Sequence, residues 1–167
     1  MTIKKFAFFM LFIGLIGCER EEPENWYDLY FSQVYSGDPA VAGANPNNID
    51  RMLVVKINDA KYRIDAALHE LDSDRIANAL INAKKRGVQV RLITETDYED
   101  EISISAVRQG GIPIKTDEGR GGLMHNKFLV FDQRAVWTGS FNTTTNDATK
   151  NNNNAIFIRS ETTHHSS

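Results

Sequence analysis

The sequence lacks three features that define common protein classes. It has a single cysteine, Cys18, so an intramolecular disulfide framework is excluded. Its longest apolar run, residues 6–16, is too short for a membrane-spanning helix, which needs about 20 residues. It also has no excess of positive charge: 19 Lys and Arg stand against 22 Asp and Glu, a net charge of -3. This balance argues against nonspecific nucleic-acid binding driven by phosphate neutralisation, although it is compatible with a local basic groove.

The amino-terminal segment has the pattern of an export signal. Two lysines precede the apolar run, and Gly17 and Cys18 close it. The ending at residues 15–18 resembles the bacterial lipobox, in which the cysteine carries lipid and becomes the first residue of the mature protein. The resemblance implies a signal segment at residues 1–18 and a lipid anchor at Cys18 that holds the protein outside the cytoplasmic membrane. A plain secretory signal is the alternative.

The rest of the chain is long enough for one domain with its own core. Charged residues 19–25 predict a tether, and the folded domain is expected over residues 26–160. Strands are predicted at 26–32, 62–68, 88–93, 112–115, 127–131, 135–138 and 155–158, and helices at 51–60, 73–86 and 99–109. Residues 37–48 read as a loop, and Asp50 as the cap of the first helix. Alternating strands and helices followed by strands predict a single α/β domain whose sheet is mixed and mostly parallel.

A set of polar residues at fixed spacing follows the predicted helices. His125, Lys127 and Asp132 precede Gly139, Ser140 and Asn142. Side chains alternate along a strand, so His125 and Lys127 share one face at the mouth of an apolar strand. There an imidazole and a cation can meet one phosphate anion.

This spacing resembles the His-x-Lys-x4-Asp-x6-Gly-Ser signature of the phospholipase D superfamily. The resemblance implies cleavage of phosphodiester bonds without a metal or other cofactor, through a phosphohistidine formed on His125. Lys127 and Asn142 would bind the nonbridging phosphoryl oxygens, and Ser140 would add a hydroxyl contact. Asp132 belongs to the same catalytic motif, but its side chain points to the opposite face from His125, so we expect an orienting or structural role.

The sequence departs from the family at residue 153. Many members have a glutamate there that holds the catalytic imidazole, whereas this chain has Asn153, which we expect among the substrate-binding residues with Ser140 and Asn142. An amide oxygen can still accept a hydrogen bond from the imidazole, but it cannot stabilise an imidazolium as a carboxylate does. We therefore expect slower chemistry or an altered pH optimum.

The family mechanism also needs a second histidine as general acid, and this chain has one motif. A homodimer would supply a second His125, or a second motif-bearing domain would lie outside these residues. His69 could in principle serve as this acid, but it lies at the end of a predicted strand and a structural role is expected. The polar tail at residues 161–167 is compatible with a truncation point.

Two classes of function remain open from the sequence. The first is a phosphodiesterase acting on phospholipid, which suits a membrane tether, or on nucleic acid, which suits a compact single-motif domain. The second is a catalytically weak or silent lipoprotein module that binds phosphate or lipid, which the substitution at Asn153 favours. No set of His, Cys and carboxylate residues has the spacing of a metal site.

Overall fold

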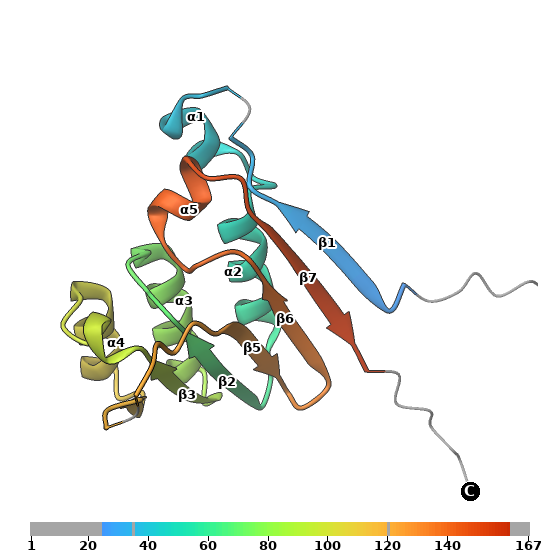
Figure 1. The fold of residues 1–167 in the computed structure, drawn as a ribbon. Coiled ribbons are helices and arrows are strands. Elements are labelled where there is room, and N and C mark those ends of the chain that lie inside the picture. The colour runs from blue at the N-terminus through green and yellow to red at the C-terminus, as the bar shows by residue number, and fades with distance from the viewer. Residues whose placement is uncertain (1–24, 35, 120, 161–167) are drawn as a thin grey trace, which may run out of the picture.

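The computed structural model describes residues 25–34, 36–119 and 121–160. The predicted signal segment, Cys18, nearly all of the tether, Arg120 and the polar tail lie outside these residues. The described chain forms a seven-stranded sheet with helices packed against it (Figure 1). The predicted α/β class and the single domain are confirmed.

The sheet has the order β1-β7-β6-β5-β2-β3-β4. Its strands are β1 (Tyr27–Phe31), β2 (Arg63–Leu68), β3 (Gln89–Thr94), β4 (Ile114–Thr116), β5 (Lys127–Phe131), β6 (Ala135–Gly139) and β7 (Asn154–Arg159). Only the pairs β2–β3 and β3–β4 are parallel, and the other four pairs are antiparallel. The sheet is therefore mixed, as predicted, but it is not mostly parallel. The turn between β5 and β6 is too short for the crossover that parallel strands need, so the second half of the chain pairs antiparallel.

Three helices follow the predicted periodicity. They are α2 (Ile49–Asp59), α3 (Asp74–Lys85) and α4 (Ile102–Gln109), the last preceded by a 3-10 turn, η1 (Thr96–Tyr98). Ser73 caps α3 through its side chain, as expected. The cap of α2 is Asn48 rather than Asp50, because the Asn48 side chain accepts from the Ile49 N–H. Asp50 instead forms an ion pair with Arg75 of α3.

Two short helices occupy segments without a clear apolar period. They are α1 (Pro39–Ala44), within the segment predicted to be a loop, and α5 (Thr145–Thr149), between β6 and β7. Both begin at a polar cap: Asp38 accepts from the Ala40 N–H, and Thr144 accepts from the Asp147 N–H. Capping side chains and tertiary contacts therefore set these helices, since neither is long enough to be stable alone.

The core lies between the helices and one face of the sheet. Helices α2, α3 and α4 pack side by side, and all the helices lie on the same side of the strands in Figure 1. Leu129 and Trp137 are almost completely buried at the centre of that face. The indole of Trp137 stacks on Tyr30 of β1 at 5.0 Å between ring centroids. This contact ties the edge strand to the centre of the core.

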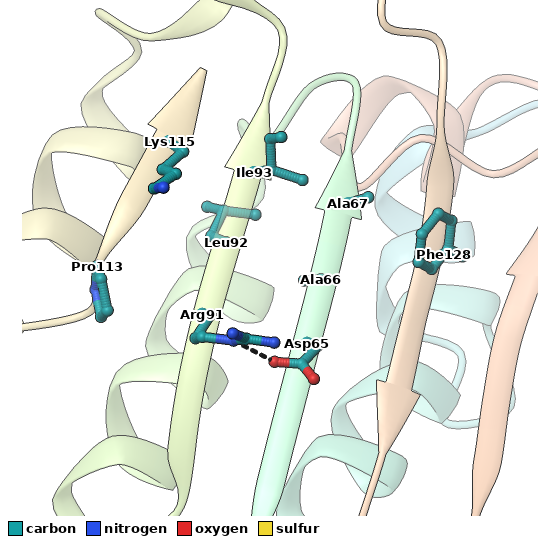
Figure 2. A pocket seen from close by; sticks show the side chains of 9 residues that line it. All are labelled: Asp65, Ala66, Ala67, Arg91, Leu92, Ile93, Pro113, Lys115 and Phe128. Carbon is teal, nitrogen blue, oxygen red and sulfur yellow. Dashed lines mark hydrogen bonds and ion pairs between the residues drawn. The ribbon is translucent and has the colours of Figure 1, made fainter. Parts of the chain in front are cut away.

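The other face of the sheet is left open by the described residues. On β1 the side chains of Leu29 and Phe31 are 55% and 54% exposed, and they alternate with less exposed ones. Figure 2 looks onto the part of this face formed by β2 to β5, with the helices behind the strands. There the small Ala67 lies between Phe128 and Ile93, to which its strand is paired on either side.

Within the described part of the chain, no helix is both long enough and apolar enough to cross a membrane.

Candidate active site

The loop that carries His125 is fastened to the ends of two parallel strands. Antiparallel pairing of β2 with β5 continues beyond Leu68, so the His69 N–H donates to the Asn126 carbonyl at 2.7 Å. The carboxylate of Glu95, which follows β3, accepts a hydrogen bond from the Met124 N–H. Residues 124–126 are thus held on both sides immediately before β5 begins. This fixes His125 at the carboxyl-terminal edge of β2 and β3.

The imidazole of His125 is exposed and lies against a second imidazole. The ring centroids of His125 and His69 are 4.5 Å apart with an interplanar angle of 73°, an edge-to-face arrangement. His69 is only 7% exposed, and its other neighbour is the Tyr98 ring at 4.9 Å. Sequence reasoning assigned His69 a structural role, whereas the structure brings it into contact with the predicted nucleophile. The sequence shows that His69 directly follows a predicted strand, but the pairing of that strand with β5, which brings His69 to His125, is seen only in the structure.

The charges around His125 favour its neutral form. The positive charge of Lys127 lowers the pKa of His125 below its ordinary value, with smaller contributions from burial and from His69. Burial also lowers the pKa of Lys127, against the opposing influence of the Asp147 and Glu70 carboxylates. The Lys127 ammonium lies 3.3 Å from the His125 carbonyl oxygen and donates to it. A neutral imidazole beside a cation is suited to nucleophilic attack on an anion.

Ser140 and Asn153 bind each other. The Ser140 hydroxyl donates to Asn153 Oδ1 at 2.9 Å and accepts from the Asn154 N–H at 3.1 Å. The Asn153 amide nitrogen donates to the Asp147 carbonyl at 3.2 Å. Both ends of the Asn153 side chain are therefore engaged away from His125. The expectation that this amide holds the imidazole does not match its contacts.

Asn142 is held in place by Asp147, a residue that sequence reasoning missed. The Asn142 N–H donates to Asp147 Oδ2 at 2.8 Å, and the Asn151 side chain donates to Asp147 Oδ1 at 2.7 Å. The Asn142 Oδ1 atom is buried and has no hydrogen-bond partner among the described residues. Asp147 was detectable in principle, because Thr144 and an acidic residue three positions later form a helix-capping pattern.

Asp132 lies at the opposite end of β5 from His125. Its carboxylate accepts hydrogen bonds from the backbone N–H groups of Lys61, Tyr62 and Arg63. Burial opposes its ionisation, but these donors outweigh burial and hold the pKa of Asp132 below its ordinary value. Asp132 therefore does not contribute to the site around His125: of the roles expected from the motif, it has the structural one and not a catalytic one.

Other candidate sites do not coincide with this one. No group of three or more His, Cys, Asp and Glu residues within 25–34, 36–119 and 121–160 is arranged to hold a metal ion. A hollow of about 320 Å³ on the open face of the sheet is lined by Ala67, Arg91, Ile93, Lys115 and Phe128, among others, and none of the predicted phosphate-binding residues lines it (Figure 2).

The fold and this motif define a phospholipase D-like domain, and comparison with known proteins gives the same result. The family described as "Cardiolipin synthase, PLD-like domain" matches residues 53–166. The chain therefore belongs to the phospholipase D-like family.

Three similar proteins show how far the likeness extends along the chain. Mitochondrial cardiolipin hydrolase from Mus musculus is 31% identical over 129 residues, which are 76% of this chain and 57% of the relative. Phospholipase D from Rickettsia prowazekii is 29% identical over 136 residues, 80% of this chain and 65% of the relative. The crystal structure of Nuc, a phospholipase D family member from Salmonella typhimurium, matches with a TM-score of 0.65 and 30% identity, over 80% of this chain and 82% of Nuc. The chain thus spans little more than half of the first of these relatives.

Proposed function

We propose that this chain is a phosphodiesterase in which His125 is the nucleophile. The observation that carries the proposal is the exposed imidazole of His125, whose pKa is lowered by the charge of Lys127, while the Lys127 ammonium contacts the His125 backbone carbonyl. Membership of the phospholipase D-like family and likeness to proteins named as a cardiolipin hydrolase, a phospholipase D and Nuc support it.

The reaction has two displacements at phosphorus. An imidazole nitrogen of His125 forms an N–P bond while the P–O bond to the leaving alkoxide breaks, and the alkoxide takes a proton. Water then attacks phosphorus and gives a proton to the group that had protonated the alkoxide, the N–P bond breaks, and neutral imidazole returns. Lys127 is proposed to stabilise, through its charge, the negative charge that builds up on the nonbridging oxygens. Asn142, fixed by Asp147, is proposed as a second group that binds these oxygens.

The proton for the leaving alkoxide is proposed to come from a second histidine outside this site. A homodimer would bring a second His125 across a twofold axis, and a second motif-bearing domain would do the same within one polypeptide. Refolding unmodified chains together with an excess of inactive His125→Ala chains distinguishes the two. A lower activity per unmodified chain supports a site shared between copies, whereas unchanged activity is expected if the second histidine comes from another domain.

The test of the proposal is turnover of bis(p-nitrophenyl) phosphate in the presence of chelator. We expect His125→Ala to lower kcat by about 10³-fold or more, as removal of a nucleophile does. Lys127→Ala should lower kcat by about 10²-fold, whereas Lys115→Ala on β4 serves as a matched lysine control and should leave kcat unchanged. Full activity of His125→Ala would disprove the mechanism. Acid-labile labelling of His125 by substrate would support the covalent intermediate directly.

The substrate class is proposed to be a phosphodiester of either a phospholipid or a nucleic acid. Relatives and structural neighbours with names of both kinds match this chain, and the net charge of -3 does not favour nucleic acid. Turnover of cardiolipin vesicles and of single-stranded DNA, measured side by side with the same preparation, decides between them. The His125→Ala chain is the blank for both assays.

A second candidate function is a module that binds phosphodiesters without turnover. The observation in its favour is that Asn153 replaces the expected glutamate and is engaged with Ser140 and Asp147. This function predicts saturable binding of the substrate, no turnover by the unmodified chain, and no phosphorylated His125.

Attachment to a membrane is a separate proposal, which the lipobox-like residues 15–18 support. Cys18→Ala should move the protein from the membrane fraction to the soluble fraction after expression in a bacterial host. An unchanged distribution would exclude a lipid anchor at this cysteine.

A further inference from the structure

The tautomer of the buried imidazole at His69 is fixed by its surroundings. His69 Nδ1 lies 3.1 Å from the Met124 carbonyl oxygen. A carbonyl oxygen only accepts hydrogen bonds, so Nδ1 carries the proton. The lone pair of neutral His69 is therefore on Nε2. The Tyr98 ring packs against the same imidazole and leaves it little freedom to rotate.

His69 is too close to His125 to protonate the leaving group. In an in-line displacement the nucleophile and the leaving oxygen lie on opposite sides of phosphorus. A general acid must lie beyond that oxygen at hydrogen-bond distance, about 2.8 Å further away. The two imidazole centroids are only 4.5 Å apart, so His69 lies on the nucleophile's side of any substrate.

The glutamate that holds the catalytic imidazole in many family members is absent from residue 153. Asn153 replaces the glutamate, and its amide binds Ser140 and the Asp147 carbonyl. Lys127 contacts the backbone carbonyl of His125 rather than its ring. Among the contacts recorded for the described residues, the ring that packs on the imidazole of His125 is that of His69.

We propose that His69 is a positioning residue for His125: its imidazole, locked by Met124 and Tyr98, holds the ring of His125 edge-to-face in the orientation for attack. The same loop links the two rings, because Met124, which binds His69 Nδ1, directly precedes His125. His69 thus holds the imidazole of His125, which Asn153 does not contact. The inference rests on the proposed function, since it concerns the group assigned there as the nucleophile.

The charged groups that act on His125, on Lys127 or on the Met124 N–H come from several elements. Lys127 comes from β5, Glu70 follows β2, Glu95 follows β3, and Asp147 belongs to α5. The charge of Lys127 is the largest influence on the pKa of His125, and His69 lowers it further. Removal of His69 should therefore raise the pKa of His125. Because the neutral form attacks, the acidic limb of the activity profile should move to higher pH.

Two substitutions separate the ring from the hydrogen bond. His69→Phe keeps a flat ring for edge-to-face packing but cannot donate to Met124, and His69→Gln keeps a donor but removes the ring. We expect kcat to fall by about 10-fold in His69→Phe and by about 100-fold in His69→Gln, with KM changed less than twofold, as for misplacement of a reacting group. In both variants the ring resonances of His125, followed by NMR during a pH titration, should show the raised pKa.

Outcomes that overturn the inference are distinct from failure of the proposed function. The NMR titration reports on the ring of His125 whether or not the chain turns over substrate, so an inactive chain with a shifted titration still supports the inference. If both variants melt at lower temperature while kcat per folded molecule and the titration of His125 stay unchanged, His69 is only structural. A variant that fails to fold is replaced by His69→Tyr, which retains the ring and is judged by the same titration.

Discussion

The carboxylate of Asp132 accepts a 2.7 Å hydrogen bond from the backbone N–H of Tyr62. It also accepts bonds from the two flanking residues, Lys61 and Arg63, and so joins the turn after β5 to the start of β2. The backbone at Asp132 and Gln133 has φ values of 52° and 59°, a left-handed turn that Asp tolerates better than most residues. The motif aspartate thus stabilises the far end of the strand that carries Lys127.

Asp132→Ala should therefore lower the free energy of unfolding and leave catalysis largely intact in the folded protein. Loss of three hydrogen bonds to a charged acceptor should lower the free energy of unfolding by about 2–4 kcal/mol. The stability of Asp132→Asn should lie between that of the unmodified protein and that of Asp132→Ala. Since the pKa of Asp132 is lowered in the fold, its contribution is complete above the unfolded-state pKa and disappears as pH falls through the folded-state pKa. Urea unfolding at neutral and acidic pH measures both effects. An unchanged midpoint would contradict the structural role.

Glu101 should make stability depend on pH in the opposite direction. Burial, followed by the neighbouring carboxylates of Glu70 and Asp72, raises its pKa from 4.5 to about 7. Its Oε2 atom is buried and has no hydrogen-bond partner within the part of the chain that the structure describes. Its unfavourable effect is absent below the unfolded-state pKa and grows as pH rises towards 7, where the folded protein must ionise a half-buried carboxyl.

Glu101→Gln should accordingly raise the free energy of unfolding by about 1 kcal/mol at pH 8, after allowance for solvent screening, and change it little at pH 4. Urea unfolding at the two pH values gives this difference. The exposed Glu118 supplies the control, because Glu118→Gln should change stability equally at both. Equal effects of Glu101→Gln on stability at the two pH values would show that ionisation of a buried Glu101 carboxyl is not the cause.

Gly139→Ala should destabilise the junction of β6 and β7 that carries Ser140 and Asn153. A Cβ atom at Gly139 would lie 2.2 Å from the Asn154 carbonyl oxygen and 2.7 Å from the Ala155 Cα, both backbone atoms that cannot move alone. Overpacking of this kind costs about 2–3 kcal/mol. Gly121→Ala is the matched control, since nothing lies within 4 Å of the added atom. Thermal melts of the two variants should differ clearly.

Ser140→Ala should act mainly through stability. Its hydroxyl exchanges hydrogen bonds with Asn153 and Asn154, so we expect a loss of about 1–2 kcal/mol. A double-mutant cycle with Asn153→Ala should give a coupling free energy of about 1 kcal/mol between the two side chains. If Ser140→Ala instead raises KM about 10-fold without loss of stability, the hydroxyl contacts the substrate, as first expected from the motif.

The elements predicted best were those with a strong apolar period. The helix that begins after Ser73 and the strand at 127–131 are set by local residues, so their positions follow from the sequence. The proportion of parallel pairs, the cap at Asn48 and the helices α1 and α5 depend on short turns and tertiary contacts, which periodicity does not encode.

In the candidate site, too, local sequence predicted some features, whereas others depend on tertiary contacts. The spacing of His125 and Lys127 predicted that they lie close together, although His125 belongs to the loop immediately before β5 rather than to the strand. The contact between His69 and His125 could not be predicted from spacing, since it depends on which strand pairs with β5. Likewise, the partners of Asn153 depend on where α5 places Asp147.

The fastening of the loop before β5 has a consequence for the order of folding. Its two anchors, His69 with Asn126 and Glu95 with Met124, join segments that are far apart in the sequence. Contacts of this kind require closure of long chain segments and form slowly compared with local helices. His125, the proposed nucleophile, can be set in place only after β2, β3 and β5 are in register. Recovery of turnover during refolding should therefore coincide with the final kinetic phase, while helical circular dichroism recovers earlier.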